Sequence, residues 1–474
     1  MRSTRRQSFH WFRMTLGLSF GCLLGCNPTL VTDDGNDRGN SNASVDDNGN
    51  ANDSADTNAN DNAGNDDDLT GGPAILREFS IPLPLFDASS AWNQRADDAD
   101  VLPESDDQIL TLYRVLVGDN TGLHPPFDGS FRYPYMVLNI DAFTVPIFPA
   151  GEGEQQVRLE DYDGIPEYPS TKWEIDFGDG PEAGLGGPVP IPNPAGEIRP
   201  AGPADVSADG WMVLVDTVDE MSYDFWTATT ARDADGNSLG GGQVGTTILA
   251  AGAADFFDIT GPGASPDGLS SARASGTPLL AGLILPEDVQ SGEISHALAC
   301  AIPRNRNLAN DPTTPLATDY VYPASTTETD WYNTNPHALA SGQRLRLKDS
   351  IVDEEGTTID ESALAPITRM YLAALRSYGL YIVDNSDGFT FYAEDIHTGN
   401  LQLSDDEVNE LIGQPAGTPL PAGRTKWHTV LDALRDDLET IPFASGDWWA
   451  DGFDPSTTTY GIANFEVVEN AMQP

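Results

Sequence analysis

The sequence predicts a mainly β protein, with a β-sandwich or jelly-roll-like body and two or three helices near the C-terminus. The chain has 46 Gly and 35 Pro, which punctuate short apolar runs as turns punctuate strands. Several of these runs alternate apolar and polar residues with the period of two that is typical of a strand. Helical periodicity begins late, at Pro366.

The predicted strands are short and spread over the whole body. They lie at residues 135–138, 157–159, 211–215, 223–226, 296–302, 344–348, 381–383 and 389–392. Residues 384–388 have the sequence Asp-Asn-Ser-Asp-Gly, which is typical of a turn, so we expect the last two strands to form a hairpin. Strands of this kind pack face to face in sandwiches and jelly rolls.

Three helices are predicted in the C-terminal part. The first begins at Pro366 and stops at Gly379, because Pro suits the first helical position and Gly the end. Ser404 and Glu407 form the capping box of a second, short helix that runs through Leu411. A third helix follows from helical spacing of four apolar side chains: Trp427, Leu431, Leu434 and Leu438.

Residues 1–25 read as an export signal, in which four Arg accompany an apolar stretch too short to span a bilayer. The stretch ends in Leu23-Leu24-Gly25-Cys26, which resembles the bacterial lipobox. That resemblance implies lipidation at Cys26 and a membrane-anchored lipoprotein of the cell envelope, facing the periplasm or the cell exterior. An ordinary signal peptide that contains a Cys is the alternative. The pair Arg5-Arg6 leaves the twin-arginine export route open.

Residues 26–75 are predicted to form a disordered acidic tether rich in Asn, Asp and Gly. The stretch has almost no large apolar residue, so it cannot bury enough surface to offset chain entropy. Residues 76–474 are then one large β-rich extracytoplasmic domain.

The formal net charge of the chain is −50. Residues 1–26 hold four Arg, and residues 27–72 hold 11 Asp and one Arg, so −44 remains on residues 73–474. Such a surface repels nucleic acid, because proteins bind phosphates through Lys and Arg. The composition therefore predicts no nucleic-acid partner.

A His-containing strand holds the first candidate for catalysis. Residues 296–302 place His296 on the face opposite a row of Ala. An imidazole at the start of a strand can act as a general acid or base beside a carboxylate. Asp176 and Asp179, three residues apart in a Gly-rich turn, are the candidate carboxylates. The alternative is a hydrogen-bonded structural His and a simple β-turn.

Asp233, Asp235 and Asn237 space oxygen ligands like the start of a calcium loop. Gly236 stands at the fourth position instead of the sixth, and no Glu follows at the twelfth, so the EF-hand pattern is not met. The sequence therefore predicts at most a looser Ca²⁺ site and no other cofactor.

Cationic and aromatic side chains are candidates for ligand binding. Arg344, Arg346 and Lys348 share one strand face and could bind uronate or sulfate groups of an acidic glycan; pairing with nearby Asp and Glu is the alternative. Exposed aromatic rings are a usual platform for sugar rings, and burial under a loop is their alternative. Three Trp in polar, turn-rich contexts are the main candidates: Trp331, Trp448 and Trp449.

Five segments occur in a recognisable order over residues 275–390. They are GLILPEDV at 282–289, GEISHAL at 292–298, YVYPA at 320–324, GQRLRLK at 342–348 and ALRSYG at 374–379. Together they resemble a family of secreted bacterial proteins with a GEIxHAL signature.

The resemblance implies an extracellular protein associated with polysaccharide, and it carries no assigned activity. The chain departs from the family pattern at Ser325-Thr326, where relatives usually have Arg-His. If that family His were catalytic, this chain would lack it.

No P-loop, Rossmann glycine pattern, HExxH, zinc cluster or GxSxG motif occurs in the chain. We therefore expect a membrane-anchored extracytoplasmic protein that engages extracellular polysaccharide as a binding or structural protein. The alternative is a carbohydrate-active enzyme, a glycoside hydrolase or lyase, that uses His296 with an Asp.

Overall fold

The computed structural model describes most of the chain after residue 75. The described residues are 76–126, 133–140, 143–151, 153–159, 185–191, 210–226, 228–232, 248–251, 253–266, 269, 271–309, 315–316, 318–329, 331–448, 450 and 452–470. The chain divides into two units, and all described residues belong to the second, Asn65–Pro474. The expected signal, the lipidation site Cys26 and the tether lie outside the described residues.

The helices are η1 (Ala91–Asn93), α1 (Ser105–Leu116), α2 (Pro286–Ser291), η4 (Glu361–Ala363), α3 (Pro366–Ser377), α4 (Asp405–Leu411) and α5 (Lys426–Leu438). The first ten strands are β1 (Leu123–His124), β2 (Met136–Asn139), β3 (Ile147–Pro149), β4 (Gly153–Leu159), β5 (Leu185–Ile191), β6 (Met212–Asp216), β7 (Met221–Trp226), β8 (Thr229–Arg232), β9 (Ile248–Ala251) and β10 (Ala253–Asp258). The others are β11 (Leu298–Ile302), β12 (Asn305–Arg306), β13 (Tyr332–Asn333), β14 (Arg344–Leu347), β15 (Leu380–Asn385), β16 (Phe389–Tyr392) and β17 (Phe465–Val468).

These strands form four sheets of mixed direction. The largest has the order β17-β14-β15-β11-β16-β2, and the others are β10-β7-β6-β3, β5-β4-β9-β8 and β1-β13-β12. Within the described residues the architecture is thus several mixed sheets with few helices. The mainly β prediction agrees with it at this level, whereas the jelly-roll sandwich stays a prediction.

The hairpin predicted between β15 and β16 is wrong. The two strands are separated by β11, which pairs parallel to β15 and antiparallel to β16. Residues 384–388 do connect the strands, but this loop turns over the end of β11. Turn composition marks where a chain reverses, whereas strand pairing is decided by which surfaces pack together.

The two faces of β11 enter different cores, as the alternation predicts. Leu298, Cys300 and Ile302 lie in the core beneath the helices, together with side chains of α1, α3 and α5. The Ala face lies in a second core that contains Trp92 and Tyr381. The chain approaches this face closely, and the Ala299 amide donates to the Gly282 carbonyl at 2.9 Å. Larger side chains would keep the two segments apart.

The strand itself is shorter than predicted. It begins at Leu298, so His296 lies in the segment that enters the strand. The Cys300 thiol is fully buried, and burial raises its pKa well above the ordinary value. Cys300 is therefore a packing residue.

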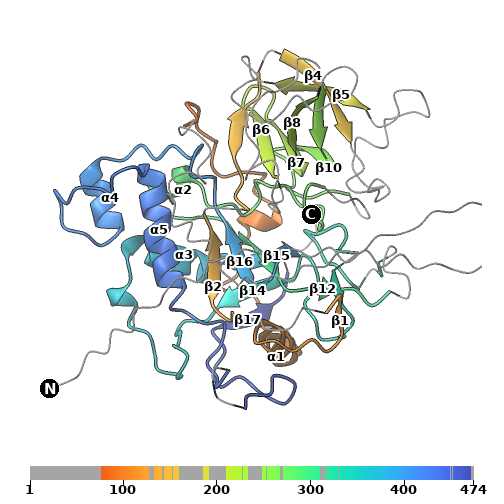
Figure 1. The fold of residues 1–474 in the computed structure, drawn as a ribbon, viewed down its shortest axis with the longest axis vertical. Coiled ribbons are helices and arrows are strands. Elements are labelled where there is room, and N and C mark those ends of the chain that lie inside the picture. The colour runs from red at the N-terminus through yellow and green to blue at the C-terminus, as the bar shows by residue number, and fades with distance from the viewer. Residues whose placement is uncertain are drawn as a thin grey trace, which may run out of the picture. The chain divides into compact units, whose positions relative to one another are not determined.

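The three predicted C-terminal helices are confirmed. Pro366 begins α3, and Ser404 and Glu407 form the capping box of α4. In Figure 1, α3 and α5 lie side by side, and α3 contacts β14 while α5 contacts β2. The N-terminus of α3 has no side-chain cap of its own. Asp437 on α5 instead accepts from the Ala365 amide at 2.8 Å.

The expectation that helices occur only late in the chain is wrong, because α1 precedes most strands. Ile109, Leu112 and Leu116 are buried and recur at helical spacing. They pack in the same core as α3 and α5, and α1 contacts β17. The spacing was present in the sequence, so this helix could have been predicted from it.

The first described residues are tied to the core by Arg77. Its guanidinium pairs with Glu394 at 2.7 Å and with Glu287 on α2 at 2.6 Å. The backbone of Arg77 donates to the Thr398 carbonyl, and its own carbonyl accepts from Asn400. The Arg77 side chain is only 2% exposed and that of Glu394 is fully buried. This buried ion cluster holds the segment around Arg77 against α2 and the segment around Glu394.

Candidate functional site

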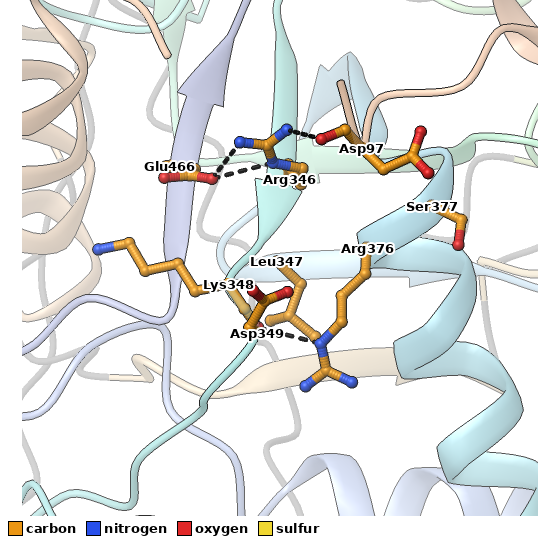
Figure 2. A pocket seen from close by; sticks show the side chains of 8 residues that line it. All are labelled: Asp97, Arg346, Leu347, Lys348, Asp349, Arg376, Ser377 and Glu466. Carbon is orange, nitrogen blue, oxygen red and sulfur yellow. Dashed lines mark hydrogen bonds and ion pairs between the residues drawn. The ribbon is translucent and has the colours of Figure 1, made fainter. Parts of the chain in front are cut away.

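A cavity of about 340 Å³ lies at the C-terminal end of β14, between that strand, α3 and β17 (Figure 2). Three cations and three carboxylates line it, so its lining carries no net charge. The lining residues are Asp97, Arg346, Leu347, Lys348, Asp349, Arg376, Ser377 and Glu466.

The two Arg of β14 that were predicted to bind ligand are both engaged within the chain. Arg346 pairs with Glu466 on β17 at 2.6 Å, and it also donates to the carbonyls of residues 96, 97 and 99. Arg344 is buried and donates to the Tyr378 carbonyl at 2.6 Å and to the carbonyls of residues 94 and 95. Arg346 thus follows the alternative interpretation, pairing with a nearby Glu, whereas Arg344 donates to backbone carbonyls. Together the two side chains hold residues 94–99.

A second cation of the pocket is engaged as well. Arg376 on α3 binds the Glu361 carboxylate with two nitrogens and the Lys348 carbonyl with a third, at 3.0 Å. Figure 2 shows the Lys348 ammonium pointing away from Arg376. Within the part of the chain that the structure describes, no ion pair of this ammonium is found. One unengaged cation among three carboxylates makes the pocket a weak site for an anion.

His296 does lie beside a carboxylate, but the carboxylate belongs to Asp288. Its Nε2 is 3.2 Å from Asp288 Oδ2, and its Nδ1 is 2.9 Å from the Ala297 carbonyl oxygen. Asp288 Oδ2 also accepts from the Leu285 amide at 3.0 Å, as the capping carboxylate of α2. The pair therefore joins the start of α2 to the start of β11.

Both ring nitrogens of His296 face oxygen acceptors, so only the doubly protonated imidazolium satisfies them together. Burial opposes this charge, but the Asp288 carboxylate outweighs it, and the pKa of His296 is raised. The imidazole is 12% exposed. With no ring nitrogen left for a substrate, this geometry favours a structural role over general acid–base catalysis.

Other predicted site residues lie outside the described residues: Asp176, Asp179, Asp233, Asp235, Asn237 and Trp449. Trp448 is half-buried and packs edge-on against Tyr135, with ring centroids 5.9 Å apart. Among the described residues, no group of three or more His, Cys, Asp or Glu is placed to hold a metal ion. The proposed Ca²⁺ site and the Asp acid–base partners thus stay predictions.

Among the described residues, Trp331 is the predicted aromatic site residue that is classed as exposed. It precedes the short strand β13 and is 42% exposed. Its backbone carbonyl accepts from the Asn385 side chain at 2.5 Å, at the end of β15. The next residue, Tyr332, stacks on His124 of β1, with ring centroids 5.2 Å apart. The sheet β1-β13-β12 thus carries aromatic side chains at the surface.

The Trp331 ring rests on a buried cation. The guanidinium carbon of Arg304 lies 4.3 Å from the ring centroid, within cation–π distance. The Arg304 side chain is 2% exposed and pairs with Asp387 at 4.0 Å. Its backbone has φ +64°, a left-handed conformation that a non-Gly residue adopts rarely. Arg304 thus contacts the ring of Trp331, and Asn385 binds its backbone carbonyl.

Sequence reasoning identified Trp331 but missed Arg304 and Asp288. Arg304 stands 27 positions before Trp331, and no spacing rule joins them. A signal for Asp288 existed, because Pro286, Glu287 and Asp288 have the composition of a helix start and His296 follows shortly.

None of the described helices is long and apolar enough to cross a membrane. Comparisons of the chain with protein-family models, with curated proteins and with solved structures found no match. The functional argument therefore depends on the residues themselves.

Proposed function

We propose that the protein binds extracellular polysaccharide through the Trp331 ring and that it is held at the cell envelope by a lipid on Cys26. The observation that carries the proposal is an aromatic residue that is 42% exposed and whose ring lies against the Arg304 guanidinium. Such a ring offers a flat apolar surface to the C–H groups of a sugar, while its polar N–H edge can stay in contact with water.

The immobilisation of Trp331 favours binding, because a side chain that is already ordered loses little entropy when a ligand stacks on it. The Asn385 amide fixes its backbone, and the Arg304 guanidinium fixes its ring. An exposed Trp without such supports would be an ordinary surface residue.

The enzyme alternative depends on His296. Asp288 supports it only in part, because it lies within reach of the imidazole but also caps α2. We therefore place binding ahead of hydrolysis or lysis.

A glycan array, followed by calorimetric titration of the polysaccharides that bind, tests the proposal. Trp331→Ala is expected to weaken binding by 1–3 kcal/mol, roughly the loss seen when an aromatic stacking surface is removed. Trp331→Phe should retain part of the affinity. Val218→Ala is the matched control, since it truncates another exposed apolar side chain. Equal binding by Trp331→Ala and the unchanged protein would refute the proposed site.

A degradation screen on the same polysaccharides tests the enzyme alternative. We expect no released product from the unchanged protein. Product formation that disappears in His296→Asn would support catalysis instead.

A further inference from the structure

We propose that α2 is part of a clasp that holds the segment around Arg77 at acidic pH and releases it at alkaline pH. The clasp consists of Arg77, Glu287, Asp288, His296 and Glu394. Two neighbouring carboxylates of α2 make separate ionic contacts, because Glu287 binds Arg77 at 2.6 Å and Asp288 lies 3.2 Å from His296 Nε2. The inference goes beyond the proposed function, since the Trp331 surface uses none of these residues.

The first ionic contact of the clasp holds two carboxylates against one cation. Arg77 donates to Glu394 at 2.7 Å and 2.8 Å and to Glu287 at 2.6 Å. The Glu394 side chain is fully buried and that of Glu287 is 11% exposed. With one positive charge for two negative ones, the contact is neutral only when one carboxyl is protonated, and burial favours that neutral form. Burial accordingly raises the pKa of Glu394 to about 7, although Arg77 opposes the rise.

The second ionic contact also holds one proton that it can lose. Asp288 is buried, and protonated His296 neutralises it. Both imidazole nitrogens face oxygen atoms, Asp288 Oδ2 and the Ala297 carbonyl, so a neutral ring sets one nitrogen lone pair against an oxygen lone pair. Loss of the proton also removes the positive charge that faces the buried Asp288 carboxylate. Burial lowers the pKa of His296, but the facing carboxylate outweighs it, and the pKa is raised.

Both contacts weaken in the same direction of pH. A group whose pKa is raised on folding stabilises the fold at low pH, and this stabilisation is lost as the pH rises through the folded-state pKa. The rule applies to Glu394, which faces Arg77 and Glu287, and to His296, which faces Asp288. Rising pH therefore leaves unbalanced negative charge at two neighbouring residues of α2, and the clasp opens.

Three further carboxylates lie near the clasp in the chain but outside it. Asp395 accepts from the Thr144 hydroxyl and pairs with His397 Nδ1 at 2.8 Å. Glu78 and Glu293 are exposed, so solvent screens their charges. The titration of the clasp is thus that of Glu394 and His296.

Two backbone amides report the state of the clasp, because its carboxylates accept their hydrogen bonds. The Ile81 amide donates to Glu287 Oε1 at 2.9 Å, and the Leu285 amide donates to Asp288 Oδ2 at 3.0 Å. When the clasp opens, both bonds break and both amides exchange with solvent. The Ile81 segment follows the predicted tether, so its release would also lengthen the tether.

Hydrogen–deuterium exchange of the unchanged protein, followed by mass spectrometry at about pH 5.5 and about pH 8, tests the proposal. Exchange rates are divided by the intrinsic rates of the same peptides, which themselves rise with pH. A carboxyl whose pKa moves from 4.5 to about 7 on folding makes opening about 25-fold more favourable at about pH 8 than at about pH 5.5. We expect the protection of Ile81 and Leu285 to fall by at least that factor, since His296 adds to it. The amides of β14 should stay better protected than these two at both pH values.

Glu394→Gln and His296→Asn should each remove part of the pH dependence, and the double variant should remove nearly all of it. Glu78→Gln, which removes an exposed carboxylate beside Arg77, is the matched control and should keep the pH dependence. Equal protection of Ile81 and Leu285 at both pH values overturns the proposal without any variant. So does pH dependence that persists in the folded double variant. Loss of protection by β14 in step with the two reporter amides also overturns it, because the opening would then be global.

Discussion

Replacing Arg77 with Met tests the energetic role of the buried ion cluster. The substitution keeps a long apolar side chain but removes the charge that faces Glu394 and Glu287. The Glu394 carboxylate would remain fully buried and would lose its closest cation. Removing one partner of a buried ion pair costs about 3–5 kcal/mol, because the other charge stays uncompensated.

The loss of unfolding free energy in Arg77→Met should depend on pH. Burial raises the pKa of Glu394 to about 7 from the ordinary 4.5, although Arg77 opposes the rise. A carboxyl whose pKa is raised on folding contributes stability below about pH 4.5 that is lost as the pH rises through about 7. At 1.36 kcal/mol per unit, the change over this window is about 3 kcal/mol. Without Arg77 the pKa of Glu394 should rise further. Arg77→Met should therefore lose more unfolding free energy at about pH 8 than at about pH 5.

Urea unfolding followed by far-UV circular dichroism at both pH values measures this effect. Arg77→Met/Glu394→Gln should lack most of this pH dependence, because Gln cannot ionise. Arg95→Met is the control, since the Arg95–Asp97 pair is exposed and we expect no measurable change. A loss below about 0.5 kcal/mol at pH 8, or a loss of equal size at both pH values, would refute the reasoning.

Three further predictions concern separate features. Gly282→Ala should destabilise the fold by more than about 2 kcal/mol in the same assay, because Gly282 has φ +70° and a Cβ would overlap the Ala299 backbone nitrogen. Gly292→Ala should lower the unfolding free energy by only about 1 kcal/mol, because Gly292 has φ +85° but no heavy atom lies near its Cβ. Equal losses in Gly282→Ala and Gly292→Ala would contradict this reasoning. His296→Asn should reduce the unfolding free energy most below about pH 6.5. The difference in unfolding free energy between variant and unchanged protein should shrink as the pH rises through the raised pKa of His296. A difference that stays constant with pH would exclude the ion pair as its cause. Cys26→Ser should remove a diacylglyceryl mass and release the protein from membranes, and an unchanged mass would end the lipoprotein hypothesis.

Local features of the fold could be predicted well from the sequence. The capping box of α4 joins Ser404 to Glu407, and Pro366 at the first helical position predicts where α3 begins. The Ala face of β11 followed from alternation within one strand. Each of these depends on residues within a few positions of one another, so the pattern contains the whole cause.

Features made by distant residues could not be predicted in the same way. The turn between β15 and β16 gave no sign that β11 would enter between them. Arg344 and Arg346 share a strand face as predicted, but both donate to carbonyls of residues 94–99.

Residue chemistry, charge and the positions of many helices and strands follow from the sequence by itself, because they depend on local propensity and composition. The export signal stays a prediction from the same sequence. Only the tertiary structure decided that His296 meets Asp288 and that Trp331 rests on Arg304. Such pairs form when packing brings distant segments together, and the free energy that selects the packing is spread over the whole core instead of being encoded at the paired positions.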